Sequence, residues 1–281
     1  MSNTLKAILI AGPTASGKSG AALDIAARFG GTIINADSMQ VYSELRVLTA
    51  RPSESEEASA PHRLYGTVPA SEAYSVGRWL DDVASAIEEA NAAGSLPIIV
   101  GGTGLYFKAL TEGLAPVPDI PAEIRARWRE EAERLGRSGL LKELVARDPA
   151  IAPRLLGGDT QRLVRALEVI DATGISLAEW QGTNAPPILD PSQTLRIVVA
   201  PEREPLYAAI DARFDTMMEE GVLEEVQRLL ALRLEPGLPA MRAHGVRELA
   251  AYLVGASSRD EAIAKSKTES RRYAKRQMTW L

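Results

Sequence analysis

The chain has 281 residues, of which 46% are hydrophobic and 25% are charged, and its formal net charge is −5. This length and composition predict a globular protein with one large α/β domain or a core with a second lobe. The acidic balance argues against sequence-blind nucleic-acid binding, which needs a basic surface, but leaves open an RNA enzyme whose positive charge is local. The absence of cysteine excludes disulfides and thiolate metal sites. No apolar run approaches the ~20 residues of a membrane span, and no secretory segment is apparent, so we expect a cytoplasmic protein.

The first predicted element is a buried strand over residues 7–11, and a glycine-rich loop follows it directly. Gly12 to Ser19 match the pattern G-x-x-x-x-G-K-[ST] of a phosphate-binding loop. The glycines permit turns that point successive N–H groups into one concavity, Lys18 adds a positive charge, and the Ser19 hydroxyl can ligate Mg²⁺. A helix predicted over residues 17–29 directs its positive dipole end at the same place. The pattern predicts a diphosphate or polyphosphate site; a glycine turn without a ligand is the alternative.

Strands and helices alternate after this loop. The pattern predicts a strand over residues 32–36, an irregular segment over 49–75, a helix over 76–93 and a buried strand over 96–100. Such alternation is typical of an α/β protein with a doubly wound parallel sheet, here of the P-loop NTPase-like kind.

Two proline-rich joints, at residues 113–121 and 182–191, bracket a segment of different character. Its strand signal is weak, and helical periodicity recurs over residues 122–135, 138–147 and 160–173. We therefore predict a mostly helical insertion domain over residues 114–190. The α/β core would then consist of residues 1–113 and 191–281, with a strand at 195–200 returning to the same sheet and helices up to the C-terminus.

Three predicted strands end in candidate site residues: the glycine-rich loop, Asp37, and the sequence Gly101-Gly102-Thr103. Ligands of an open parallel sheet bind outside the carboxyl ends of its strands, so these ends should face one cleft. Asp37 could accept a proton from a substrate or reach Mg²⁺ through water, or it could simply cap the next turn. Thr103 could donate to a substrate, or the glycine pair could only form a tight turn.

Most phosphate-loop hydrolases hold Mg²⁺ with an aspartate at the end of a second buried strand. The strand at residues 96–100 ends in Gly-Gly-Thr instead. The sequence therefore favours a small-molecule kinase or another phosphate-displacing transferase over a motor or GTPase.

Local basic clusters stand out in this acidic chain. Residues 265–276 contain six basic side chains against one acidic, and a helix there would stack Arg272 on Arg276. Arg162 and Arg165 lie one turn apart in the insertion. Solvated faces paired with glutamates would explain each cluster, whereas a polyanion such as RNA would explain both together.

Arg213 and the histidines are harder to interpret. Arg213 lies between Asp211 and Asp215, and this spacing alone predicts an ion pair within one helix. His62 and His244 have no spacing that suggests a metal site, so we expect surface or structural roles for both.

Taken together, these segments resemble one family, the bacterial tRNA dimethylallyltransferases, also called tRNA isopentenyltransferases. The matching segments occur in the family's order and cover nearly the whole chain. They are Gly12-Pro13-Thr14-Ala15-Ser16-Gly17-Lys18-Ser19, Asp37-Ser38-Met39-Gln40-Val41-Tyr42, Ala60-Pro61-His62-Arg63, Gly101-Gly102-Thr103-Gly104-Leu105-Tyr106, Gln161-Arg162, Arg165-Ala166-Leu167-Glu168, Arg213, and Tyr273-Ala274-Lys275-Arg276-Gln277-Met278-Thr279-Trp280.

The resemblance implies transfer of the dimethylallyl group of dimethylallyl diphosphate to N6 of the adenosine 3′ of the tRNA anticodon, with release of diphosphate, by a monomer. It implies diphosphate binding by Gly12, Pro13, Thr14, Ala15, Ser16, Gly17, Lys18 and Ser19, with Mg²⁺ at Ser19. It implies catalysis by Asp37 as the base, with Thr103 at the nucleotide and Arg213 on the diphosphate. The expected tRNA contacts are Asp37, Ser38, Met39, Gln40, Thr103, Arg125, Gln161, Arg162, Leu163, Val164, Arg165, Lys275 and Arg276.

Some residues depart from the family's usual pattern. Ser19 replaces a frequent threonine, Arg51 a lysine, Ala209 an arginine, and His244-Gly245-Val246 an Ile-Gly-Tyr. The sequence ends at Leu281, where many relatives continue with a strand and a helix, so an edge strand of the sheet could be lacking. Three other readings stay open: a small-molecule kinase, an isopentenyltransferase of free adenylate, and an RNA-binding regulator without catalysis.

Overall fold

The computed structural model describes residues 5–183 and 185–280. They form two compact units, one made of the residues up to Thr111 together with those from Ile188 onward, and the other of Glu112–Pro187. In this described part of the chain, no helix combines the length and the apolar character that crossing a membrane requires.

The first unit is built on a five-stranded sheet with the strand order β3-β2-β4-β1-β5. The strands are β1 (Ala7–Ala11), β2 (Gly31–Asn35), β3 (His62–Arg63), β4 (Leu96–Gly101) and β5 (Thr194–Val198). All these pairings are parallel, and Ile10 of the interior strand β1 lies opposite Val100 on one side and Ile197 on the other. The carboxyl ends of β1, β2 and β4 therefore lie at the same edge, as the sequence predicts.

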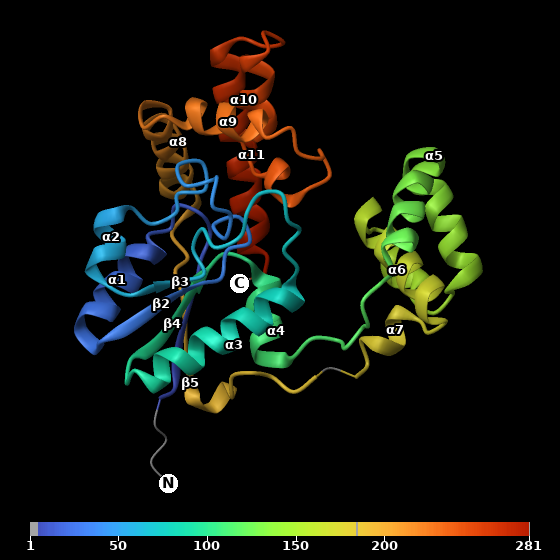
Figure 1. The fold of residues 1–281 in the computed structure, drawn as a ribbon, viewed down its shortest axis with the longest axis horizontal. Coiled ribbons are helices and arrows are strands. Elements are labelled where there is room, and N and C mark those ends of the chain that lie inside the picture. The colour runs from blue at the N-terminus through green and yellow to red at the C-terminus, as the bar shows by residue number, and fades with distance from the viewer. Residues whose placement is uncertain (1–4, 184, 281) are drawn as a thin grey trace. The chain divides into compact units, whose positions relative to one another are not determined.

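Helices cover both faces of this sheet (Figure 1). Successive strand residues point to opposite faces, so Ile8 and Ile10 pack on one side with α1 (Lys18–Phe29), and Leu9 packs on the other side with α3 (Val76–Ala92). Trp79 of α3 stacks on Tyr106 of α4 (Gly104–Glu112), with ring centroids 4.2 Å apart. Burial on both faces explains why β1, β2 and β4 are mostly apolar runs, whereas the edge strand β5 is partly exposed.

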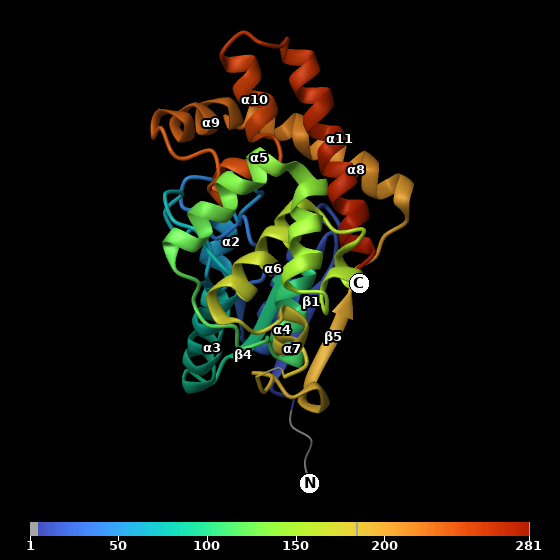
Figure 2. The same ribbon diagram turned by 90° about the vertical axis from the view of Figure 1, so that its right-hand side faces the viewer.

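Four further helices of the first unit gather at the carboxyl edge of the sheet (Figures 1 and 2). They are α8 (Arg203–Glu219), α9 (Val222–Ala231), α10 (Val246–Leu253) and α11 (Arg259–Met278). They extend the hydrophobic core beyond the sheet, because Phe214, Val226 and Leu249 belong to the same buried cluster as Leu9 of β1. Helices from the C-terminal third of the chain thus cover part of the edge at which the strands end.

The segment predicted to be irregular, residues 49–75, contains two elements that the sequence analysis missed. These are a short helix, α2 (Glu54–Ser59), and the two-residue strand β3. The helix begins with a capping box in which the Ser53 hydroxyl accepts from the Glu56 backbone N–H and the Glu56 carboxylate accepts from the Ser53 backbone N–H. The prediction was wrong here because the cap stabilises a helix that has no apolar periodicity.

The second unit is helical. Its helices are α5 (Ala122–Arg147), α6 (Thr160–Thr173) and α7 (Leu177–Trp180), with a 3₁₀ turn at Ala152–Leu155. Trp128, Leu144 and Leu163 lie in its own hydrophobic core. The α5 ribbon is interrupted at Gly136, whose φ of 60° is not helical, so the two helices predicted around this point meet at a kink. Asp159 caps α6, because its carboxylate accepts from the Arg162 N–H at 2.9 Å.

Candidate functional site

The glycine-rich loop turns sharply between β1 and α1. Gly17, the N-cap of α1, has φ 87°, and Ala15 has φ 63° without being a glycine. A left-handed conformation at an alanine costs about 1–2 kcal/mol, so contacts around the loop must maintain it. The Ser16 hydroxyl oxygen is buried and has no hydrogen-bond partner among the described residues. A buried oxygen without a partner beside helix-end N–H groups suits a polar ligand in the loop.

Lys18 lies inside this loop and donates from Nζ to the Pro13 carbonyl at 3.1 Å. Burial lowers the pKa of Lys18 to about 8; the carboxylate of Asp37 opposes this shift and the cation of Arg213 adds to it. Lys18 therefore lies close enough to both side chains to sense their charges, and it can respond to an anion entering the loop.

Asp37 is positioned by Asn35, the last residue of β2. The Asn35 side chain accepts from the Asp37 N–H at 2.8 Å and donates to the carbonyls of Asp37 and Leu64 at 2.9 and 3.0 Å. Asp37 in turn accepts from the Met39 N–H through Oδ1 at 2.9 Å. Asp37 therefore does cap the turn that follows it, through Oδ1. Its Oδ2 has no such bond in the described part of the chain and is available to a substrate.

The turn after β4 is joined to the same place. The Thr103 hydroxyl accepts from the Ser38 N–H at 3.2 Å, and the Thr103 N–H donates to the Ala36 carbonyl at 3.3 Å. Gly101 packs so tightly that an added Cβ would lie 2.0 Å from the Ala36 oxygen. The structure thus brings together the strand ends that the sequence predicts to converge.

Arg213 reaches this group from α8. Its guanidinium donates to the Thr14 hydroxyl, and burial lowers its pKa while the charge of Asp37 opposes the shift. The expectation of an ion pair within α8 was wrong, because Asp211 and Asp215 bind basic side chains of α11 instead. Spacing within one helix could not reveal that the neighbouring helix competes for these carboxylates.

Two hollows meet at these residues. One is a cavity of about 60 Å³ with apolar walls from Leu48, Phe214 and Met217, and the other is an open cleft of about 960 Å³ along the glycine-rich loop. Both are lined by the same group of residues, which are Thr14, Asp37, Thr49, Arg213 and Met217. A ligand could therefore place an anionic end in the loop and an apolar end beside Asp37.

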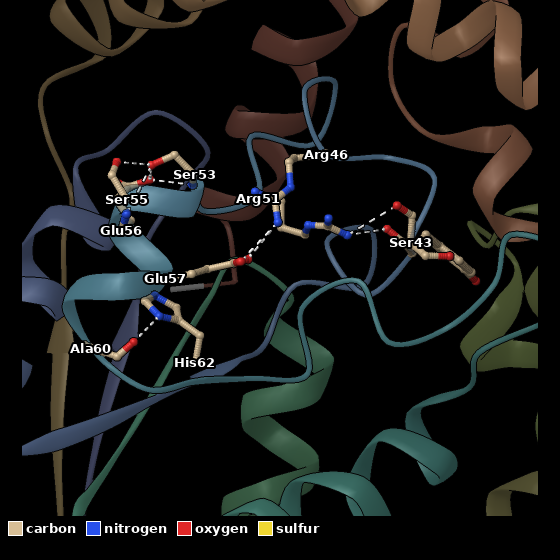
Figure 3. A network of polar contacts seen from close by, with 10 residues as sticks. Ser43, Arg46, Arg51, Ser53, Ser55, Glu56, Glu57, Ala60 and His62 are labelled. Atoms are coloured by element: carbon tan, nitrogen blue, oxygen red, sulfur yellow. Dashed lines mark hydrogen bonds and ion pairs between the residues drawn. The ribbon is translucent and has the colours of Figure 1, made fainter.

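The outer wall of the cleft is a polar network in the segment between β2 and β3 (Figure 3). Arg46 forms an ion pair with Glu57 at 3.1 Å, and Arg51 donates to the carbonyls of Tyr42 and Ser43 at 3.2 and 3.5 Å. Met39 lines the cavity and Gln40 the cleft, but the Gln40 amide nitrogen is bound by the Thr49 and Ala50 carbonyls at 2.9 and 3.0 Å. Among the described residues, the Gln40 side-chain oxygen has no such bond, so it can still accept from a ligand.

The rings of His244 and Tyr273 also line the cavity, although the sequence did not indicate a place in the site for either of them. Their rings lie 4.6 Å apart between centroids. Burial is the main cause that lowers the pKa of His244, so its imidazole is neutral near pH 7. Burial likewise raises the pKa of Tyr273. Neither has a spacing signal, because His244 lies in the turn before α10 and Tyr273 lies in α11, and the two meet only in the folded chain.

Five of the basic residues of α11 fall into two groups. Those near its middle are neutralised by carboxylates at 2.6–2.7 Å, in the pairs Lys267–Asp215, Arg271–Asp211 and Arg272–Glu269. Lys275 and Arg276, which are predicted to contact tRNA, are exposed in the last turn, and Arg276 lies over the Tyr273 ring at 5.7 Å.

The remaining predicted tRNA contacts belong to the second unit. Arg125, Gln161 and Arg162 are exposed, whereas Arg165 is partly buried and lies 3.6 Å from Glu168. Val164 packs against the core of this unit, and Leu163 is completely buried in it. The tRNA contact predicted for Leu163 therefore cannot involve its side chain.

A glycine-rich loop between a central parallel strand and a helix, with Lys18 and Arg213 directed at it, defines a phosphate-loop α/β protein. The comparisons with known proteins identify which kind. Residues 40–281 match the family described as IPP transferase, and residues 5–68 match that described as Isopentenyl transferase. The chain belongs to the IPP transferase family.

Individual relatives agree with this assignment. A tRNA dimethylallyltransferase of Bradyrhizobium sp. (strain ORS 278) is 55% identical over 275 residues, which are 98% of this chain and 89% of the relative. One of Rhodopseudomonas palustris (strain BisA53) is 56% identical over 276 residues, covering 98% of this chain and 84% of the relative.

Solved structures agree as well. A tRNA isopentenylpyrophosphate transferase from Bacillus halodurans is 34% identical with a TM-score of 0.70, covering 99% of this chain and 86% of its own. A eukaryotic dimethylallyltransferase acting on tRNA is 30% identical with a TM-score of 0.84, covering 99% and 70%.

Proposed function

We propose that this chain transfers the dimethylallyl group of dimethylallyl diphosphate to N6 of the adenosine 3′ of the anticodon in tRNA and releases diphosphate. The observation that carries the proposal is the junction of two hollows at Asp37: one is lined by the phosphate loop, the other by apolar side chains. This arrangement fits a short apolar group attached to a diphosphate, with a carboxylate where the two meet. We further propose that the enzyme acts as a cytoplasmic monomer.

The diphosphate end is held by residues of the loop, Gly12, Pro13, Thr14, Ala15, Ser16, Gly17, Lys18 and Ser19, together with Arg213. An allylic carbon tolerates positive charge, so the main task in the reaction is to stabilise the departing diphosphate. Lys18 and Arg213 are preorganised for this, since both are partly buried, both line the cleft, and both bond to residues of the loop. Fixed cations in a partly water-excluded site interact with developing negative charge more strongly than they would in water.

Mg²⁺ is the divalent ion that we propose for this site, with Ser19 as its protein ligand. Ser19 lines the cleft, and the described residues contain no cluster of three or more His, Cys, Asp or Glu that could hold a metal. This fits Mg²⁺, which commonly takes few protein ligands and completes its shell with phosphate oxygens and water. When bound, the ion would supply Lewis-acid stabilisation of the leaving diphosphate.

Asp37 is the proposed base. An exocyclic adenine amine is too weak an acid to lose a proton before reaction, so Asp37 would act late, once C–N bond formation has made the nitrogen acidic. Oδ2 is suited to this, because Oδ1 is already bound to the Met39 N–H. The target adenine would leave its stack and lie among Thr103, Ser38, Met39 and Gln40.

Basic side chains, together with one glutamine and part of the backbone, would position the tRNA. These are Arg125, Gln161, Arg162 and Arg165 of the second unit, with the backbone near Leu163 and Val164, and Lys275 and Arg276 of α11. Phosphate contacts of this kind fix the register of an RNA, whereas contacts to the extracted base give selectivity.

The test is incubation with dimethylallyl diphosphate, Mg²⁺ and unmodified tRNA, followed by mass spectrometry of the nucleosides. We expect an N6-prenylated adenosine. The matched variant is Asp37→Asn, which keeps an Oδ1 acceptor for the Met39 N–H but removes the base, so turnover should fall roughly 10²–10⁴-fold while tRNA affinity stays the same. Absence of prenylated adenosine with the wild-type protein, alongside ATP-dependent phosphorylation of a metabolite, would replace the proposal by a kinase. Normal turnover of Asp37→Asn would remove Asp37 from the mechanism.

A further inference from the structure

Gln277 is a buried polar residue in the last turn of α11, with a side chain only 4% exposed. A buried amide needs partners for both its oxygen and its nitrogen, since each unsatisfied group costs about 1–3 kcal/mol. Both partners of Gln277 come from segments far away in the sequence, and both lie at the edge of the sheet where the phosphate loop begins.

The Gln277 side chain bridges two neighbouring strand ends. Its Oε1 accepts from the Thr14 N–H at 2.9 Å, and its Nε2 donates to the Gly102 carbonyl at 3.0 Å. The β1–β4 ladder ends with the pair Ala11 and Gly101, so the amide continues the connection just past the last paired residues. Gly102 permits this approach, because an added Cβ would lie 1.9 Å from the Gln277 nitrogen.

This bridge determines which polar groups of Thr14 can bind a ligand. Its N–H points at Gln277 and not into the cradle, while its hydroxyl accepts from Arg213. Thr14 is thereby held from two sides, immediately before Ala15 with its left-handed φ of 63°. Strained backbone of this kind persists only where its surroundings fix it, and Gln277 is one of the groups that fix its neighbour.

We propose that Gln277 is a positioning residue of the donor site: it holds the first turn of the phosphate loop in the conformation that receives the diphosphate, without touching the ligand. The inference rests on the proposed function for its substrate, but its geometry concerns the loop alone. It assigns a role to the end of α11 that is separate from tRNA contact by its exposed basic side chains.

The experiment compares Gln277→Met, which keeps the length but removes both polar groups, with Gln277→Asn, which is one methylene too short for both bonds. The matched control is Gln227→Met, the same exchange at an exposed glutamine of α9. Calorimetry with inorganic diphosphate should show at least tenfold weaker binding for Gln277→Met and at least threefold weaker binding for Gln277→Asn, with no change for the control. In turnover, the KM for the donor should rise while the KM for tRNA stays within twofold.

Hydrogen exchange of the loop peptide gives a second readout, because the Thr14 N–H of Gln277→Met should exchange faster than in the control. Folded Gln277 variants with wild-type diphosphate affinity and loop exchange would overturn the proposal. A Gln277→Met protein that does not fold leaves the decision to Gln277→Asn. Since diphosphate binding is measured directly, failure of the wild-type protein to prenylate tRNA would refute the proposed function and leave this test intact.

Discussion

The affinity of the phosphate loop for diphosphate should fall as the pH rises through about 8, because Lys18 loses its proton there in the free protein. Burial is the largest cause that lowers the pKa of Lys18 from 10.5 to about 8. A bound diphosphate places negative charge beside Nζ and favours the protonated form. The contribution of Lys18 to binding is therefore nearly complete at about pH 7, and above about pH 8 binding must first restore the proton.

The size of the effect follows from this pKa. With a free-state pKa of about 8, Lys18 is about nine-tenths protonated at pH 7 and about one-tenth protonated at pH 9. Linkage then predicts uptake of about 0.1 proton per diphosphate at pH 7 and about 0.9 at pH 9, with affinity falling about tenfold between them. An alkyl diphosphate is the suitable ligand, because its terminal phosphate, with a last pKa near ~6, is largely ionised over this range, whereas inorganic diphosphate would itself titrate.

Calorimetry with an alkyl diphosphate in buffers of different ionisation enthalpy measures this proton uptake directly. Lys18→Arg is the control, because a guanidinium stays charged at all these pH values and should abolish the pH slope even if it alters the affinity. Equal affinities at pH 7 and pH 9 for the wild-type protein, with no proton uptake at pH 9, would show that Lys18 is not the group that titrates beside the ligand.

Two other substitutions test how the site is held. Glu225 of α9 is 3% exposed and accepts three backbone N–H groups from residues 46–48 at 2.8–2.9 Å, so Glu225→Ala should lower the free energy of unfolding by about 2–4 kcal/mol in a urea titration; a loss under about 1 kcal/mol would contradict this. Arg213→Lys loses the planar guanidinium that contacts Thr14, and we expect the KM for the donor to rise roughly tenfold with an unchanged KM for tRNA; an effect on tRNA alone would place Arg213 outside the donor site.

Local patterns predicted the parts of the site that lie on consecutive residues. The glycine loop, Asp37 and the Gly-Gly-Thr turn each follow a short apolar strand, and the parallel order of those strands places them together. The exception among local features is α2, where a capping box outweighs the lack of apolar periodicity. The spacing of apolar residues alone does not reveal such a cap.

The residues that the sequence did not predict reach the site from distant parts of the chain. Gln277 bonds to Thr14 across 263 residues, and His244 meets Tyr273 only because α10, which follows His244, packs against α11. The sequence places Arg213 between two aspartates, and nothing local indicates that α11 binds both of them. One-dimensional spacing describes a single helix, whereas these roles depend on which helices become neighbours.

The charges that meet at the junction of the two hollows explain why a divalent cation suits this site. Lys18 and Arg213 face one carboxylate there, Asp37, which leaves about one positive charge when both cations are protonated. A fully ionised diphosphate ester brings about three negative charges. Together with Lys18, Arg213 and Asp37 it therefore leaves the complex with about two negative charges in excess. One Mg²⁺ held at Ser19, as proposed above, would offset that excess. This count also explains how the site can function without the strand-end aspartate of phosphate-loop hydrolases. A second carboxylate beside the diphosphate would cancel the positive charge on which its departure depends.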